Sequence, residues 1–222
     1  MTKGTSVLNI EGLRRHTVLF LLIAASIALA AWTVLAITRD TAHDADEFWQ
    51  AFQIGGDEVE GYPTLQAMAE AADGVVIARL TSLGLSRTVQ GDAEQDLVGY
   101  AGARVTVERT IAGSVPDVLT LELLIPTTAT TLTEQGLDTF AARFANELPA
   151  ESVLLFLRDK GGKEEGLYRV VNSLGLWISD PDGVRAPLYP ADPGEVVYAD
   201  ETAGVSNFAE LADRLSRSAP KP

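Results

Sequence analysis

The sequence RVTVERTIAGSVPDVLTLELLI, residues 104–125, contains two runs in which apolar and polar side chains alternate. A period of two places the apolar side chains on one face of a strand and the polar ones on the other. Between the runs, residues 113–117 (GSVPD) combine Gly, Pro and Asp, which favour a turn. The stretch therefore predicts an antiparallel hairpin with one buried face and one solvated face.

Apolar runs on either side of this hairpin predict further strands. Residues 75–83 and 153–157 are rich in β-branched and other apolar residues, as is typical of buried strands. Residues 84–102 are polar and contain Gly, so we expect a long loop there. The sequence DKGGKEEG, residues 159–166, predicts a solvated hairpin loop that leaves Glu164 and Glu165 in water. The remaining strands are predicted at residues 167–171, 175–178, 184–188 and 195–199.

Helical periodicity predicts helices around these strands. Apolar residues recur at helical spacing in residues 65–72 and 137–148, and again from Phe208 to Leu215 behind the cap residue Asn207. Because strands predominate and are short, we expect a mainly β fold with peripheral helices. Closure of the strands into a small antiparallel barrel would protect their edges.

Four segments carry a resemblance to a known family. They are residues 72–78 (ADGVVIA), 105–113 (VTVERTIAG), 152–157 (SVLLFL) and 167–177 (LYRVVNSLGLW). Together, over about residues 64–188, they resemble the OB-fold domains similar to tissue inhibitors of metalloproteinases and netrin modules, which occur in many bacterial exported proteins. The resemblance implies an OB-like barrel, with Ala78 and Ala112 departing from the Gly and Lys that are frequent at these positions.

The resemblance does not extend to the mechanism of the eukaryotic inhibitors. Those proteins chelate a protease zinc through an N-terminal cysteine and its free amine, and this chain contains no cysteine. The fold alone leaves the function open.

An apolar run near the N-terminus predicts a membrane anchor. Residues 17–38 (TVLFLLIAASIALAAWTVLAIT) contain no charged residue and, as a helix, would span roughly 33 Å, which exceeds a hydrocarbon core of about 30 Å. Arg14 and Arg15 precede the run, so the positive-inside rule places residues 1–16 in the cytoplasm. We expect a single-pass signal-anchor in the cell membrane with everything after it extracytoplasmic. The alternative is a signal peptide cleaved after residues 28–30 (ALA), which would give a secreted protein.

The chain after the anchor divides into two parts. Residues 39–61 are predicted to form an acidic stalk, and residues 62–222 a single OB-like domain with an insertion at 126–150 and a C-terminal helix. Within the stalk, Phe48, Trp49 and Phe52 have helical spacing. They are expected to dock on the domain or sit at the membrane interface, or else to form a partner-binding helix.

Composition excludes several kinds of chemistry. A formal net charge of −14 repels phosphate backbones and anionic headgroups, so nucleic-acid binding is disfavoured. The absence of cysteine removes disulfides and thiolate sites. The two histidines, His16 and His43, precede the predicted domain, so we expect neither a Ser-His-Asp triad nor a zinc site containing histidine. We expect no cofactor and no bound metal.

The candidate site residues are therefore mainly aromatic. Trp177, Tyr189 and Tyr198 occur late in the chain among Pro and Gly, where loops could present them to a partner. For Trp177, which lies in a predicted strand, packing in the core is the preferred interpretation. Asp180 and Asp182 resemble part of a calcium loop, but the later ligands are missing and a plain turn is the simpler interpretation.

These observations favour a non-catalytic, membrane-tethered domain that binds another exported or membrane protein at the cell envelope. Phe48, Trp49, Phe52, Trp177, Tyr189 and Tyr198 are its candidate interaction residues. One alternative is a carboxylate-dependent hydrolase of envelope polymers. Another is an inhibitor or ligand sensor that uses the barrel mouth or the 126–150 insertion.

Overall fold

Strands dominate the computed structural model, which describes residues 46–53, 60–90, 97–126, 133–181, 183–190 and 197–218. All of these residues belong to one compact unit, Asp44–Pro222. The strands are β1 (Gly74–Gln90), β2 (Leu97–Gly113), β3 (Val118–Ile125), β4 (Val153–Asp159), β5 (Leu167–Val170), β6 (Leu176–Asp180) and β7 (Gly183–Arg185). The helices are α2 (Leu65–Ala71), α3 (Glu134–Phe144), α4 (Ala199–Thr202) and α5 (Phe208–Ser218), with a 3₁₀ turn at Gly162–Glu164. The expectation of a mainly β fold with a few helices is confirmed.

Five of the strands form a closed cycle of pairings, because β4 pairs with β1. The sheet order is β1-β2-β3-β5-β4-β6-β7, and β1 pairs additionally with β4. All of these pairings are antiparallel except that of β3 with β5, which is parallel and joins Thr120 to Leu167 and Leu121 to Tyr168. The expectation of a wholly antiparallel arrangement is therefore wrong at this pairing, because β3 and β5 are joined through α3 and β4 rather than by a hairpin.

The hairpin at residues 104–125 is confirmed, but the long loop predicted at residues 84–102 is not. Strand β1 continues to Gln90 and β2 begins at Leu97, and the two pair along this whole length. Register shifts interrupt the pairing between Leu80 and Ser82 and between Leu85 and Arg87. Such bulges break the period of two, so the polar extension lacks the alternation that marks a strand.

The strand predicted at residues 195–199 is also wrong where it can be tested. Residues 195–196 lie outside the described residues, Tyr198 has a left-handed backbone (φ 50°), and α4 begins at Ala199. The amide groups of Glu201 and Thr202 donate to the Tyr198 carbonyl, which closes a local turn in place of a strand pairing. By contrast, the predicted cap of α5 is present, since the Glu210 amide donates to Asn207 Oδ1 at 3.0 Å.

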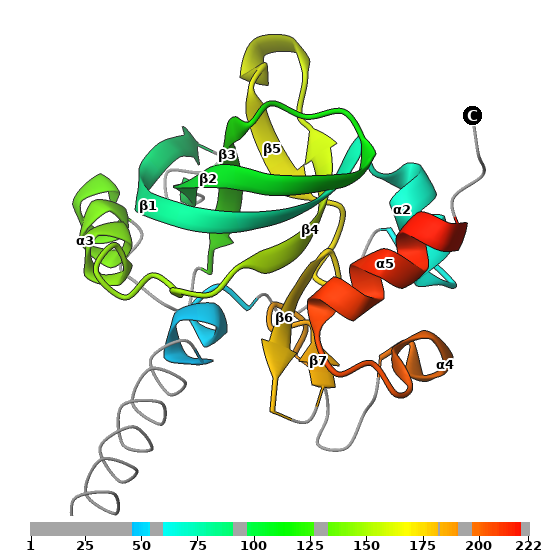
Figure 1. Ribbon diagram of the computed structural model, residues 1–222. Coiled ribbons are helices and arrows are strands. Elements are labelled where there is room, and N and C mark those ends of the chain that lie inside the picture. Colours follow the sequence, from blue (N-terminus) through cyan, green and yellow to red (C-terminus); the bar gives the residue numbers. More distant parts are fainter. Residues whose placement is uncertain are drawn as a thin grey trace, which may run out of the picture. The chain divides into compact units, whose positions relative to one another are not determined.

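Two hydrophobic cores lie on opposite sides of β1 and β4. Alternate residues of β1, such as Val76 and Ala78, belong to the first core, which α3 also lines. The intervening Val75 and Ile77 belong to the second core, which α2 and α5 cover. Figure 1 shows α3 on one side of the sheet and α2 and α5 on the other. Burial on both faces explains why the first residues of β1 and of β4 form nearly continuous apolar runs.

Residues 46–53 of the predicted stalk belong to the folded body. Residues 46–50 are helical, and Phe48, Trp49 and Phe52 are at most 2% exposed in the first core. The ring centroids of Phe52 and Phe140 of α3 are 5.5 Å apart. Docking on the domain, rather than a free partner-binding helix, is therefore what these aromatics do in the described structure.

No helix among the described residues is both long and apolar enough to span a bilayer. The anchor predicted at residues 17–38 lies outside the described residues, as do Arg14 and Arg15.

Gly113 is expected to be indispensable where β2 ends. Its φ is +73°, and a Cβ there would lie 2.0 Å from the Asp73 carbonyl oxygen. We expect Gly113→Ala to lower the free energy of unfolding by about 3 kcal/mol, because strain and a steric clash add. Urea denaturation followed by circular dichroism would measure this. Gly84→Ala in β1, which meets no atom within 4 Å, is the control and should change stability by less than about 0.5 kcal/mol. Equal losses for the two variants would contradict the argument.

Candidate functional site

A cavity of about 440 Å³ lies beside the β6–β7 hairpin. Its walls come from β6, from β7 and the chain that follows it, from both ends of the α4 region and from the segment that follows the N-terminal helical turn. The described lining residues are Gln53, Trp177, Val184, Arg185, Ala186, Pro187, Tyr189, Pro190, Val197 and Thr202. The volume falls within the range of about 300–1,000 Å³ that is usual for ligand pockets.

Ion pairs and a side-chain hydrogen bond fix the cavity wall. Arg185 of β7 donates through Nε to Asp180 Oδ2 at 2.8 Å and through a terminal nitrogen to Asp46. Gln53 Nε2 donates to the Pro187 carbonyl at 2.9 Å. Segments more than 130 residues apart in the sequence therefore meet at this wall.

Two of the three late aromatic candidates line the cavity. Trp177 is 1% exposed and packs in the second core, as the core interpretation predicted, and it also forms part of the cavity wall. Its indole Nε1 has no hydrogen-bond partner in the described part of the chain. Tyr189 is half-buried and lines the same cavity.

Tyr198 stands behind this wall. Its ring centroid is 6.4 Å from that of Trp177, and its hydroxyl donates to the Tyr62 carbonyl at 2.8 Å. Burial raises the pKa of Tyr198, with Glu201 and Tyr62 adding to the effect. Tyr198 therefore packs against the second core next to Trp177.

The lining residues carry a single charge. Among the described residues around the cavity only Arg185 is charged, and it pairs with two carboxylates, Asp46 and Asp180, so that these three side chains together carry one net negative charge. Proline, aromatic and aliphatic residues are the majority of the lining, but Gln53, Arg185 and Thr202 also line the cavity, so it suits a group that has both apolar and polar atoms.

Only one of the two candidate calcium ligands, Asp180, lies in the described part of the chain. The Asp180 carboxylate is engaged by Arg185, and Asp182 lies outside the described residues. Within the described ranges, no group of three or more His, Cys, Asp or Glu side chains could hold a metal ion.

A buried charged cluster was missed by the sequence reasoning. Alternation places Glu122 of β3 on the solvated face, yet its side chain is fully buried. It accepts hydrogen bonds from Lys160 Nζ at 2.7 Å, from Ser86 Oγ at 2.5 Å and from Arg87 Nε at 3.1 Å. Glu164, expected in water, pairs with Arg87. The pattern of β3 contains no signal for this, because the covering side chains come from β1 and from the β4–β5 loop.

The cluster keeps Glu122 ionised. Burial by itself raises the pKa of this carboxyl group, but the hydrogen bonds from Lys160 and Ser86 and the nearby positive charges outweigh it. The pKa of Glu122 therefore lies below its ordinary value of 4.5. The stabilisation is complete above the ordinary pKa and is lost as the pH falls through the lowered one.

Comparison with known proteins adds no family. A scan against protein-family models finds none that matches this chain, and a search of curated proteins finds no match either.

Replacing Glu122 should alter both stability and its pH dependence. We expect Glu122→Gln to lower the free energy of unfolding by about 3 kcal/mol at pH 7, because it removes the buried carboxylate that Arg87 and Lys160 share and leaves them only the partly exposed Glu164. Below pH 4.5 the difference from wild type should shrink, because Glu122 takes up a proton first in the unfolded chain and then, below its lowered pKa, in the folded protein. Urea denaturation at several pH values would measure both effects. If the stability difference between Glu122→Gln and wild type stayed constant down to about pH 2, Glu122 would not be ionised in the folded protein. Glu165→Gln serves as the control.

Proposed function

We propose that the chain is a single-pass, membrane-anchored protein whose extracytoplasmic body is a non-catalytic domain that binds another exported or membrane protein. The single observation that carries this proposal is the cavity beside β6 and β7, where Trp177 and Tyr189 meet residues from distant parts of the chain. The uncharged run at residues 17–38, preceded by Arg14 and Arg15, supports the anchor and its orientation.

We propose further that the body is an OB-like barrel. The pairings β1-β2-β3-β5-β4-β1, with α3 between β3 and β4, support this assignment. The resemblance to domains similar to tissue inhibitors of metalloproteinases and netrin modules points the same way. In this scheme β6 and β7 are additions outside the ring of pairings, and the cavity belongs to the addition.

The aromatic, proline and aliphatic residues of the lining favour a side chain of a partner protein as the occupant of the cavity, with Gln53 and Thr202 beside them for its polar atoms. Aromatic and proline walls offer large contact areas at little cost in side-chain entropy, as in many protein interfaces. A ligand sensor is the second candidate, supported by a volume that also suits a small apolar molecule. The hydrolase alternative draws no support from the cavity, because no carboxylate is among its described lining residues.

The orientation can be tested with a reporter enzyme. Alkaline phosphatase fused after Pro222 should be active in a bacterial host, because the enzyme matures only outside the cytoplasm. Replacing Arg14 and Arg15 with Glu should lower that activity by weakening the positive-inside signal. N-terminal sequencing of the mature protein should show that residues 1–30 are still present. A mature protein that begins at Ala31 would mean that the segment is a cleaved signal peptide and not an anchor.

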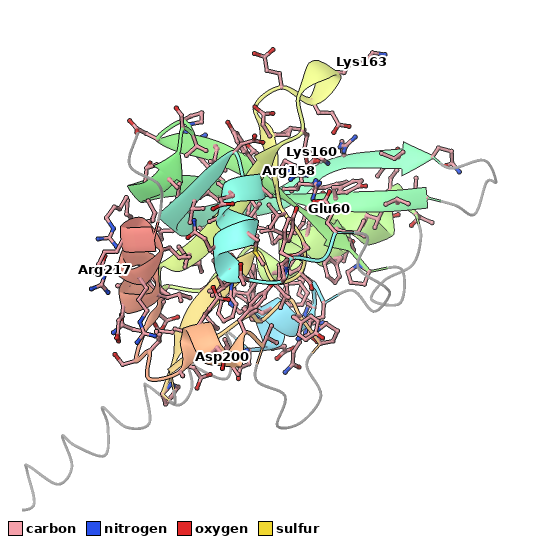
Figure 2. The ribbon with its side chains drawn as sticks, turned by 90° about the vertical axis from the view of Figure 1, so that its right-hand side faces the viewer. Glu60, Arg158, Lys160, Lys163, Asp200 and Arg217 are labelled. Atoms are coloured by element: carbon pink, nitrogen blue, oxygen red, sulfur yellow. The ribbon has the colours of Figure 1, made fainter. Side chains whose placement is uncertain are left out.

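The binding surface can be tested by site-specific crosslinking in intact cells. A photo-crosslinking amino acid at Tyr189 should give one reproducible protein adduct, because this side chain lines the cavity. The same amino acid at Arg217, near the C-terminal end of α5, is the control (Figures 1 and 2). No adduct from Tyr189, or identical adducts from both positions, would argue against a partner at the cavity. Saturable binding of a small apolar molecule to the cavity would favour the ligand-sensor function instead.

A further inference from the structure

The loop between β4 and β5 contacts the sheet through charged side chains. Its residues 160–166 have the sequence KGGKEEG, which contains no apolar side chain larger than Gly. Figure 2 shows Lys163 at the outer end of this loop and Lys160 nearer the sheet. The ion pairs of Lys160 and Glu164 are thus the side-chain contacts that bind the loop to β1 and β3.

Glu122 binds two cationic side chains, Arg87 and Lys160, on the side that faces the sheet. Arg87 Nε lies 3.1 and 3.2 Å from the two Glu122 oxygens, and Lys160 Nζ lies 2.7 Å from Oε2. Both cations also face the ring of Tyr100, each 4.6 Å from its centroid. Their positions therefore depend on Glu122 and Tyr100 as well as on Glu164, and they are preorganised.

Glu164 is the outer partner of the same two cations. Arg87 Nη1 pairs with Glu164 Oε1, and Lys160 Nζ lies 3.5 Å from Oε2. The Glu164 side chain is 34% exposed, whereas that of Glu122 is fully buried. The Glu122 carboxylate is thus buried beneath Arg87 and Lys160, whereas the Glu164 carboxylate lies on a loop and is partly exposed to water.

The charges define what the outer position accepts. Arg87 and Lys160 together with Glu122 leave one net positive charge, which a single carboxylate neutralises. A dianion would be repelled by Glu122 directly behind the two cations. The present occupant is a glutamate side chain of the same chain, and a glutamate of an acidic peptide offers the two cations the same carboxylate.

We propose that Arg87 and Lys160 form a binding site for a carboxylate side chain of an acidic peptide segment, and that Glu164 occupies this site in the free protein. Binding is then an exchange of one carboxylate for another, with the β4–β5 loop released as the peptide enters. This site is separate from the Trp177 cavity and does not depend on the function proposed for it.

The test compares two variants of the full chain that have the same net charge. Glu164→Gln empties the site, whereas Glu165→Gln removes the neighbouring charge and leaves Glu164 in place. The probe is a fluorescently labelled hexaglutamate peptide, and fluorescence anisotropy at low ionic strength measures its dissociation constant. We expect Glu164→Gln to bind about tenfold more tightly than wild type, because no internal carboxylate competes. The Glu165→Gln variant should stay within about twofold of wild type, and hexaglutamine should not bind.

Three results would overturn the proposal. Equal affinity of the two variants would mean that only overall charge matters, and no gain for Glu164→Gln would mean that the site does not accept an external carboxylate. Tighter binding of an oligogalacturonate than of hexaglutamate would assign the site to acidic polysaccharides instead. Arg87→Gln in the Glu164→Gln background should abolish binding, and the first comparison stands even if that double variant fails to fold.

Discussion

The pairing of β1 with β4 is the contact on which the rest of the structure depends. Residues 74–78 of β1 face residues 157–153 of β4 in antiparallel register. This pairing closes the cycle that runs through β2, β3 and β5, and it also forms the wall between the two cores. Because side chains on both faces of both strands are buried, loosening this one pairing would expose apolar surface on two sides at once.

The closure also explains how the ends of the described chain are held. The N-terminal helical turn packs its aromatic side chains against α3 in the first core, and α5 covers the second core. Asp46 and Gln53 then reach the β7 region through Arg185 and Pro187. The cavity is therefore assembled where the N-terminal segment meets the chain around β7.

Sequence patterns predict the elements whose environment is simple. Strands β2 and β3 alternate because one face is buried, and α5 has a recognisable cap at Asn207. The prediction failed where register shifts broke the period in β1 and where Tyr198 adopts a left-handed backbone. It could not anticipate the parallel β3–β5 contact, which rests on two residue pairs between strands far apart in the sequence.

The same limit applies to the candidate sites. Trp177 and Tyr189 were recognisable because aromatic residues near Pro and Gly often lie at surfaces, but the contribution of Gln53 to their cavity depends on the tertiary fold. Glu122 was hidden for a related reason: its alternation is that of a solvated position, and burial comes from Lys160 and Arg87 on other strands and loops. Local pattern specifies which face a side chain occupies, whereas distant segments decide what covers that face.

The placement of the tryptophans has a practical consequence. Of the three in the chain, Trp32 lies outside the described residues, Trp49 is buried in the first core and Trp177 in the second. Each core thus contains its own intrinsic emitter. Spectra of single-tryptophan versions would show whether the two sides of the central sheet melt together or one after the other, without any added dye.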